Sequence, residues 1–232
     1  MVNVPCPLLQ EIYQTKRVHD AAGSPVELAD EISSAYAEAL YRTVLARKPA
    51  TVLEVGMAYG LSSLAIARGL RDAGGTGKLI SIDPGQTNSY KRIGRLNVER
   101  AGYGHNHELI EQLDFIALPM LLGRGQKIDL AYIDGWHTFD YCLLDFFYCD
   151  KLLNPGGVVA FNDTRFQAVH KVIAFVKTHR HYKEIDVGLP INYRGRNALV
   201  TGARWLTGRP IQDRYFEKLE EWEPPWNFYA QF

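Results

Sequence analysis

The sequence predicts an α/β fold in which helices cover both faces of a doubly wound, mostly parallel sheet. Three observations predict it. Short apolar runs alternate with longer amphipathic segments along the chain. The runs lack the polar alternation of half-exposed strands, so we expect both of their faces to be buried. Acidic residues and glycines follow several runs directly, at the positions where open parallel sheets bind ligands.

Length and composition limit the possible organisation and partners. At 232 residues the chain is long enough for a single domain, which we expect to consist of N-terminal helices (1–48), an α/β core (49–203) and an aromatic C-terminal extension (204–232). Lysine plus arginine and aspartate plus glutamate each total 26, so no excess charge favours nucleic acid. No run spans a bilayer and no signal core begins the chain, which predicts a soluble cytoplasmic protein without a membrane partner.

The N-terminal region is expected to contain two helices. Leu8, Leu9 and Ile12 recur at helical spacing in the first. Pro25 is expected to open the second, because proline is tolerated in the first turn of a helix. The Lys48-Pro49 step ends this helix and leads into the first strand of the sheet.

A glycine-containing turn follows the first strand of the sheet, in the stretch TVLEVGMAYG. Glu54 lies near the carboxyl end of this strand, and Gly56, Ala58 and Gly60 leave space for a ligand to approach the backbone. The amide groups of the next helix, near Ser62, can bind a carboxylate. A strand-to-helix connection without a ligand would explain the same turn, but its place in the predicted sheet favours binding.

Two further acidic residues follow the next strands. Asp83 ends the strand predicted at residues 78–83, where a carboxylate can accept hydrogen bonds from both vicinal hydroxyls of a ribose. An aspartate before Pro-Gly can also cap a turn, although Glu54 one strand earlier favours the ribose contact. Asp114 follows the strand predicted at residues 107–111, and either contacts an adenine or caps the following helix.

Acidic residues also follow the fourth and fifth strands, which are predicted at residues 127–133 and 157–161. Asp134 begins an Asp-Gly-Trp-His segment after the fourth strand, and Asp163 lies just beyond the fifth. Together with Glu54 and Asp83, they predict four carboxylates at one edge of the sheet. A helix-capping role would explain Asp134 alone, but it would not explain why acidic residues recur at the ends of four strands.

The order of these motifs is similar to that of a known family. E-x-G-x-x-x-G, S-I-D-P, Y-I-D-G-W-H and N-P-G-G-V-V-A-F-N-D-T resemble the class I S-adenosylmethionine-dependent methyltransferases over about residues 40–177. They most resemble the bacterial small-molecule O-methyltransferase branch with D-G-x-H and D-D-T motifs. The resemblance implies a Rossmann-like, seven-stranded sheet with an antiparallel edge hairpin, S-adenosylmethionine as cofactor, and O-methylation of a sugar or phenolic metabolite.

The resemblance also implies specific catalytic residues. Some relatives bind magnesium through an aspartate after the fourth strand, and through an aspartate and a neighbouring oxygen ligand after the fifth. These positions fall on Asp134, Asp163 and either Asn162 or Thr164. Asn162 replaces the first acid of the D-D-T motif, which leaves metal binding open. Catechol-type relatives place a lysine base where this chain has His137, whose ordinary pKa of about 6.5 suits proton removal near neutral pH.

The remaining segments carry weaker signals. The helix predicted at 138–153 is apolar almost all round, which indicates contact with the N-terminal helices or with a second copy of the chain. Strands are expected at 182–187 and 197–201, and a helix at 214–222. The ending EPPWNFYAQF is too aromatic for a solvated tail, so it should pack on the body, line a substrate pocket or join a partner.

Two other functions are weighed against methyl transfer. A module that binds the same cofactor without catalysis is suggested by Asn162. A nicotinamide-dependent oxidoreductase would also use a glycine turn after the first strand. The spacing after Gly56 does not match the G-x-G-x-x-G fingerprint of dinucleotide binding, which disfavours the oxidoreductase.

Overall fold

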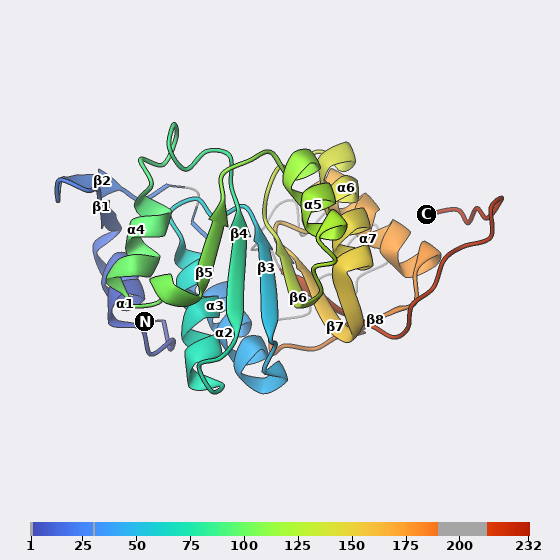
Figure 1. The fold of residues 1–232 in the computed structure, drawn as a ribbon, viewed down its shortest axis with the longest axis horizontal. Coiled ribbons are helices and arrows are strands. Elements are labelled where there is room, and N and C mark those ends of the chain that lie inside the picture. The colour runs from blue at the N-terminus through green and yellow to red at the C-terminus, as the bar shows by residue number, and fades with distance from the viewer. Residues whose placement is uncertain (1, 30, 190–212) are drawn as a thin grey trace, which may run out of the picture.

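The computed structural model describes residues 2–29, 31–189 and 213–232, which form helices around one large sheet and one small hairpin (Figure 1). The helices are α1 (Pro7–Thr15), α2 (Ser34–Arg47), α3 (Leu61–Asp72), α4 (Ile93–Arg100), α5 (Asp114–Gly123), α6 (Phe139–Leu152) and α7 (Gln167–His179). The strands are β1 (Arg17–His19), β2 (Pro25–Glu27), β3 (Thr51–Val55), β4 (Lys78–Ile82), β5 (His107–Ile110), β6 (Ile128–Ile133), β7 (Leu153–Phe161), β8 (Tyr182–Ile185) and β9 (Arg214–Lys218). A short 3₁₀ helix, Gly104–Asn106, precedes β5.

The large sheet has a doubly wound topology. In the described residues it contains seven strands in the order β5-β4-β3-β6-β7-β9-β8. Neighbouring strands from β5 to β7 are parallel, whereas β9 is antiparallel to both β7 and β8. The chain builds outward from β3 to β5 and then continues on the other side of β3 with β6. This topology confirms the predicted fold, and its strand order reverses at β3 and β6, where such sheets bind ligands.

Helices cover both faces of the sheet. On one face, α1 to α4 enclose a core that includes Leu64 and Tyr132. On the other face, α5, α6 and α7 enclose a second core that includes Phe146 and Phe161 (Figure 1). Within the described residues, no helix has the length and apolar character needed to cross a membrane.

The N-terminal region differs from the prediction. Pro25 opens strand β2, which pairs antiparallel with β1, and the second helix begins only at Ser34. The side chain of Ser33 caps this helix by accepting a hydrogen bond from the backbone N–H of Tyr36 at 3.3 Å. Proline suits the end of an edge strand as well as the first turn of a helix, so Pro25 alone did not identify the helix start.

The C-terminal region also differs from the prediction. Residues 214–222 were expected to form a helix, but they begin with strand β9. Tyr215 and Phe216 are 1% and 0% exposed, and they enter the cores on opposite faces of the sheet. Pairing with β7 and β8 makes this double burial possible, whereas a surface helix would bury one side. The predicted core boundary at 203 is therefore too early, and the strand expected at 197–201 lies outside the described residues.

Helix α6 is largely enclosed, in agreement with its apolar sequence. It contacts α5, α7 and the sheet. Because α1 and α2 contribute to the core on the opposite face, they are not its partners as the sequence had suggested. Phe139 and Phe147 remain 39% and 43% exposed, and contact of α6 with a second copy stays a prediction.

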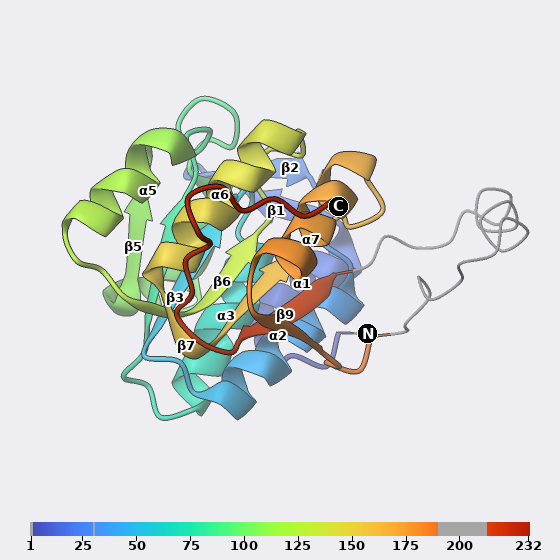
Figure 2. The same cartoon turned by 90° about the vertical axis from the view of Figure 1, so that its right-hand side faces the viewer.

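The aromatic tail packs on the body of the protein. Figure 2 shows the segment after β9 running back toward α7. The backbone N–H of Ala230 donates to Nε2 of His179 at 3.2 Å. The His179 ring also lies against Phe228 and Phe232, with centroid separations of 5.4 and 5.2 Å. Of the three locations considered for the tail, packing on the body is the one found in this chain.

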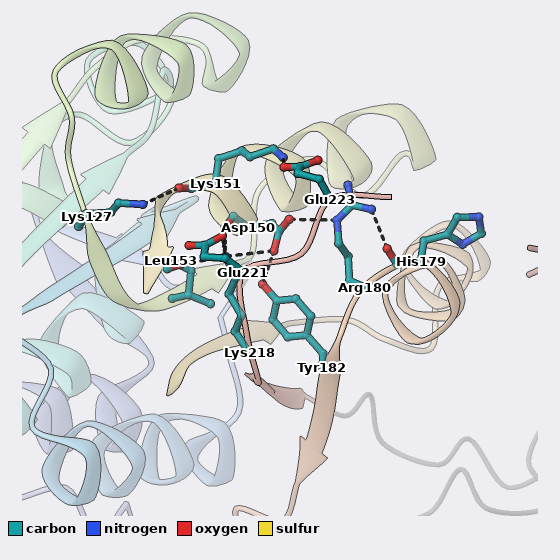
Figure 3. A network of polar contacts seen from close by, with 10 residues as sticks. All are labelled: Lys127, Asp150, Lys151, Leu153, His179, Arg180, Tyr182, Lys218, Glu221 and Glu223. Atoms are coloured by element: carbon teal, nitrogen blue, oxygen red, sulfur yellow. Dashed lines mark hydrogen bonds and ion pairs between the residues drawn. The ribbon is translucent and has the colours of Figure 1, made fainter. Parts of the chain in front are cut away.

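A buried ionic network fastens the edge hairpin to α6 (Figure 3). The carboxylate of Asp150 accepts hydrogen bonds from Nε of Arg180 at 3.0 Å and from the hydroxyl of Tyr182 at 2.8 Å. Lys218 is 2% exposed, and its Nζ donates to the carbonyls of Asp150 and Leu153 at 2.6 and 3.0 Å. The network therefore joins the end of α6 to both strands of the hairpin.

We expect Asp150→Ala to lower the free energy of unfolding by about 3 kcal/mol, because Arg180 would stay buried without the anion it pairs with and Lys218 would keep only Glu221. Urea denaturation followed by circular dichroism measures the change. Glu99→Ala provides the control, since Glu99 forms an exposed ion pair with Arg95 on α4 and should contribute less than about 1 kcal/mol. Equal losses in the two variants would show that the Asp150 network is not a stabilising centre.

Candidate functional site

Backbone hydrogen bonds align the carboxyl ends of the parallel strands. In each case the N–H of the first residue after one strand donates to the carbonyl of the last residue of a neighbouring strand. The pairs are Asp83 to Ile110 (3.1 Å), Gly56 to Ile82 (2.9 Å), Asp134 to Val55 (2.8 Å) and Asn162 to Ile133 (3.0 Å). The segments that follow β4, β3, β6 and β7 therefore leave the sheet side by side.

Three of the predicted site residues meet at this edge. Asp134 follows β6, His137 lies three residues later, and Asp163 follows β7. Nε2 of His137 lies 3.6 Å from Oδ1 of Asp134 and 3.5 Å from Oδ2 of Asp163. This buried nitrogen has no hydrogen-bond partner among the described residues. The imidazole is thus held between two carboxylates.

The backbone of Asp163 contributes to this arrangement. Its φ angle is +53°, in the left-handed region that residues other than glycine seldom occupy. The carbonyl of Asp163 accepts the N–H of Phe166 at 2.9 Å, which closes a turn just before α7. The Phe166 ring lies 5.4 Å from the His137 ring, so the same turn places both Asp163 and an aromatic side chain beside the imidazole.

Burial and the two carboxylates control the protonation of this group. Burial raises the pKa of Asp134 to about 6 and also raises the pKa of Asp163. Burial by itself would lower the pKa of His137, but Asp134 and Asp163 outweigh it and raise this pKa above 6.5. His137 therefore accepts a proton more readily than a free imidazole, and both neighbours stabilise the charged ring.

Asn162 belongs to a different group of contacts. Its Nδ2 donates to Oδ1 of Asp213 at 2.9 Å and to the hydroxyl of Tyr132 at 3.1 Å. The Tyr132 hydroxyl donates in turn to Oδ2 of Asp213 at 3.0 Å. Burial raises the pKa of Asp213 well above its ordinary value. These contacts direct Nδ2 of Asn162 toward Asp213, just before β9, and the expected role of Asn162 as a metal ligand stays a prediction.

Asp83 holds the turn that follows β3. Its Oδ2 accepts the backbone N–H groups of Met57 at 3.2 Å and Ala58 at 2.7 Å. Nε2 of Gln86 donates to the same oxygen at 2.9 Å. Among the described residues, Oδ1 accepts only the N–H of Gly85, at 2.7 Å, so it retains a lone pair. The buried Oε1 of Gln86 has no partner within the described part of the chain.

Glu54 does not reach the edge with the other carboxylates. It is 0% exposed, and its Oε2 accepts the hydroxyls of Ser63 on α3 and Ser81 on β4, both at 2.6 Å. Burial raises the pKa of Glu54 to about 7, although nearby hydroxyls, including that of Ser62, oppose this shift. The prediction that all four carboxylates share one cleft is therefore wrong for Glu54, which supports the turn from beneath.

The small residues of the turn are required by close packing. Gly56 has φ +88°, and a Cβ there would lie 2.1 Å from the carbonyl oxygen of Asp134. Gly60 has φ +82°, and a Cβ there would lie 2.9 Å from the carbonyl oxygen of Gly94. Ala58, between them, adopts φ +46°. The turn is therefore pressed between the loop after β6 and the start of α4.

Asp114 is the first residue of α5 and is 7% exposed. Its Oδ1 accepts the N–H of Phe115 at 2.7 Å, and its negative charge suits a helix N-terminus. Both predicted roles, helix capping and ligand contact, therefore remain compatible with its position. Asp145 of α6 lies next to Asp114 and is fully buried.

Comparison with known proteins identifies the family. A sequence profile described as "Methyltransferase domain" matches residues 53–164, which extend from β3 to the turn after β7. Residues 53–164 thus match a methyltransferase domain. This finding confirms the family that the motif order suggested. A search of curated proteins finds no match to the sequence.

Solved methyltransferases have the same fold at low sequence identity. An O-methyltransferase from Bacillus cereus in complex with S-adenosylhomocysteine (SAH) is 21% identical, with a TM-score of 0.63 over 77% of this chain and 82% of that one. The SAH-bound methyltransferase PaMTH1 from Podospora anserina is 17% identical, with a TM-score of 0.65 over 92% and 88%. The O-methyltransferase TomG from Streptomyces achromogenes, in complex with S-adenosylmethionine, is 18% identical, with a TM-score of 0.59 over 92% and 90%.

Asp83 and Gln86 retain hydrogen-bonding capacity in the turn after β4. Among the described residues, Oδ1 of Asp83 accepts one hydrogen bond and the buried Oε1 of Gln86 accepts none. In contrast, no three His, Cys, Asp or Glu side chains of the described residues are arranged to hold a metal. The contacts of Asn162 use its Nδ2, which donates to Asp213 and Tyr132, so a magnesium site at Asp134, Asp163 and Asn162 stays a prediction.

Sequence reasoning missed three polar residues of this methyltransferase site. Gln86 carried a usable signal, because it follows Asp83 by three residues in the segment Asp-Pro-Gly-Gln. Asp145 was visible as an acid in an apolar helix, but its partner on α5 was not. Asp213 carried no local signal, because its contacts to Tyr132 and Asn162 depend on the pairing of β7 with β9.

We expect Gly56→Ala to destabilise the methyltransferase by more than about 3 kcal/mol, because the positive φ and the contact with Asp134 both oppose a Cβ. Gly23→Ala is the matched control. Gly23 has a similar φ of +80°, but a Cβ there would meet nothing within 4 Å, so only the backbone cost of about 1–2 kcal/mol applies. Urea unfolding of both variants measures the difference, and similar losses would contradict the proposed role of the contact.

Proposed function

We propose that this methyltransferase transfers the methyl group of S-adenosylmethionine to a hydroxyl group of a small molecule, either a sugar or a phenolic metabolite. The observation that carries the proposal is the position of His137 Nε2, unbonded and between Asp134 and Asp163. A hydroxyl acceptor needs such a base, because its proton must leave when the methyl group arrives. Solved O-methyltransferases with this fold add support.

The cofactor contacts follow from the order of the strand ends. We assign the ribose hydroxyls to Asp83 and Gln86, and the adenine edge to Asp114. The N-terminal turn of α3, near Ser62, offers backbone N–H groups for the methionine carboxylate. Asp134 connects the turn after β3 with His137. Its backbone N–H donates to the carbonyl of Val55 at the end of β3, and its carboxylate lies 3.6 Å from Nε2 of His137.

Exposed aromatic side chains next to His137 provide a place for the acceptor. Trp136 is 68% exposed, and Phe166 is 40% exposed with its ring 5.4 Å from that of His137. Flat apolar surfaces of this kind pack against phenol rings and against the C–H faces of sugars. An acceptor held there would have its hydroxyl group near Nε2 of His137.

The chain contributes alignment and proton removal to the reaction. When bound, the cofactor supplies a methyl group that is already activated by a positively charged sulfonium. His137 accepts the hydroxyl proton, and Asp134 and Asp163 stabilise the imidazolium that forms. One positive charge is lost at the sulfur and one appears on His137, so the charge of the site stays constant. This proton path assigns no step to a metal.

Isothermal titration calorimetry with SAH tests the cofactor assignment. We expect wild-type protein to bind SAH and Asp83→Ala to bind it at least about tenfold more weakly, because a charged acceptor of ribose hydroxyls is lost. Asp186→Ala removes an exposed carboxylate after β8 and should leave binding unchanged. No binding by folded wild-type protein would refute the cofactor assignment.

The pH profile of initial rates tests the role of His137, with an acceptor found by screening phenols and sugars. Rates should rise with pH through the raised pKa of His137, because only the neutral imidazole accepts a proton. Asp163→Asn should move this rise to lower pH, because one of the carboxylates that raise the pKa is lost.

His137→Gln should reduce kcat by about 10²-fold or more while SAH binding is retained. Rates measured with EDTA and with added Mg²⁺ provide the control, and they should agree within about twofold. A large loss with EDTA that Mg²⁺ restores would contradict a proton path that needs only His137 and its two carboxylates.

A further inference from the structure

Asp145 is a buried acid that the proposed reaction leaves without a role. Its side chain is 0% exposed on α6, and neither carboxyl oxygen has a hydrogen-bond donor in the described ranges. The residue lies beneath the loop after β6, since a Cβ built on Gly135 would be 3.6 Å from Oδ2 of Asp145. Its other neighbour is Asp114, the residue assigned to the adenine edge.

The two aspartates require a shared proton. Within residues 2–29, 31–189 and 213–232, neither Asp114 nor Asp145 forms an ion pair that could balance two negative charges. Two adjacent carboxyl groups in such surroundings retain one proton between them. Burial and the neighbouring Asp114 raise the pKa of Asp145 to about 9, which places this proton on Asp145 at neutral pH.

The other titratable groups near Asp145 leave this assignment unchanged. Cys142 and Cys149 lie on the same helix, and burial raises the pKa of both thiols, so they are neutral. α5 contributes Asp114, and the loop after β6 contributes Asp134 close to Gly135. None of these groups carries a positive charge that would favour an ionised Asp145.

We propose that Asp145 is a positioning residue for the nucleobase, a neutral carboxylic acid whose O–H group donates to Asp114 and sets the preference for adenine. This inference rests on the proposed S-adenosylmethionine site. Oδ1 of Asp114 already accepts the N–H of Phe115 at 2.7 Å. A second donor from Asp145 fixes the carboxylate and leaves its remaining lone pairs for the 6-amino group of adenine. A 6-oxo purine presents a carbonyl oxygen there, which the carboxylate disfavours.

Calorimetric titration with SAH and with S-inosylhomocysteine, its 6-oxo counterpart, tests the inference. Wild-type protein should bind SAH at least about tenfold more tightly than the 6-oxo compound, since two acceptors would then face each other without a hydrogen bond. Asp145→Asn keeps the shape and a donor, so its preference should stay within about threefold of wild type. Asp145→Ala removes the donor, and its preference should fall by at least about fivefold.

The pH dependence of SAH binding separates this role from simple packing. Wild-type affinity should fall between pH 8 and pH 10 as Asp145 loses its proton, whereas Asp145→Asn should lose this part of the dependence. Because the folded-state pKa of Asp145 is raised, the contribution of Asp145 to stability declines as pH rises from about 4 to about 9. Asp145→Asn should therefore melt several degrees higher than wild type at pH 8.

The outcomes distinguish this inference from the function on which it rests. If wild-type protein binds SAH but Asp145→Ala keeps the full preference for adenine, the inference fails and the proposed function stands. The inference also fails, and the proposed function stands, if SAH binding by Asp145→Asn keeps the pH dependence of wild type. This second test can be made even if Asp145→Ala does not fold. If wild-type protein binds neither compound, the proposed function itself fails.

Discussion

The contact between Gly56 and the carbonyl of Asp134 is the constraint on which the site depends. A Cβ on Gly56 would lie 2.1 Å from that oxygen, so the turn after β3 and the loop after β6 approach each other as closely as their backbones allow. The turn carries the N–H groups held by Asp83, and the loop carries His137. The sides proposed for the cofactor and for the acceptor are therefore linked through backbone, which fixes their separation better than flexible side chains would.

The site concentrates acidic groups in a chain whose formal charge is zero. Burial raises the pKa of Glu54 to about 7 and that of Asp145 to about 9, so these two groups are partly or wholly neutral near pH 7. Asp134, at about 6, is mostly ionised. The negative charge is thus placed beside His137, where the proposed reaction would form an imidazolium. The acids elsewhere contribute hydrogen bonds to the surrounding structure.

The sequence was informative where local pattern and topology agree. Continuous apolar strands followed by acids predicted the sheet, and the spacing of Asp134 and His137 placed both at one strand end. Glu54 was misjudged because strand residues alternate between faces, and the fourth residue of β3 faces α3. Strand β9 was misjudged because its burial comes from β7 and β8, which are distant in sequence. The contacts of Asp213 with Tyr132 and Asn162 depend on the same pairing of distant segments, so the sequence could not predict them.

The pairing of Asn162 with Asp213 explains the departure from the D-D-T motif that this chain otherwise resembles. With aspartate at 162, two buried carboxyl groups would face each other, and the Tyr132 hydroxyl would be the one remaining donor of the present contacts. The amide of Asn162 supplies the second donor, so each oxygen of Asp213 receives a hydrogen bond. Asp213, just before β9, therefore requires a neutral donor directly after β7. Asp134 and Asp163 therefore lie beside His137, where they can balance the charge of one imidazolium. Asp213 is instead hydrogen-bonded to Asn162 and Tyr132.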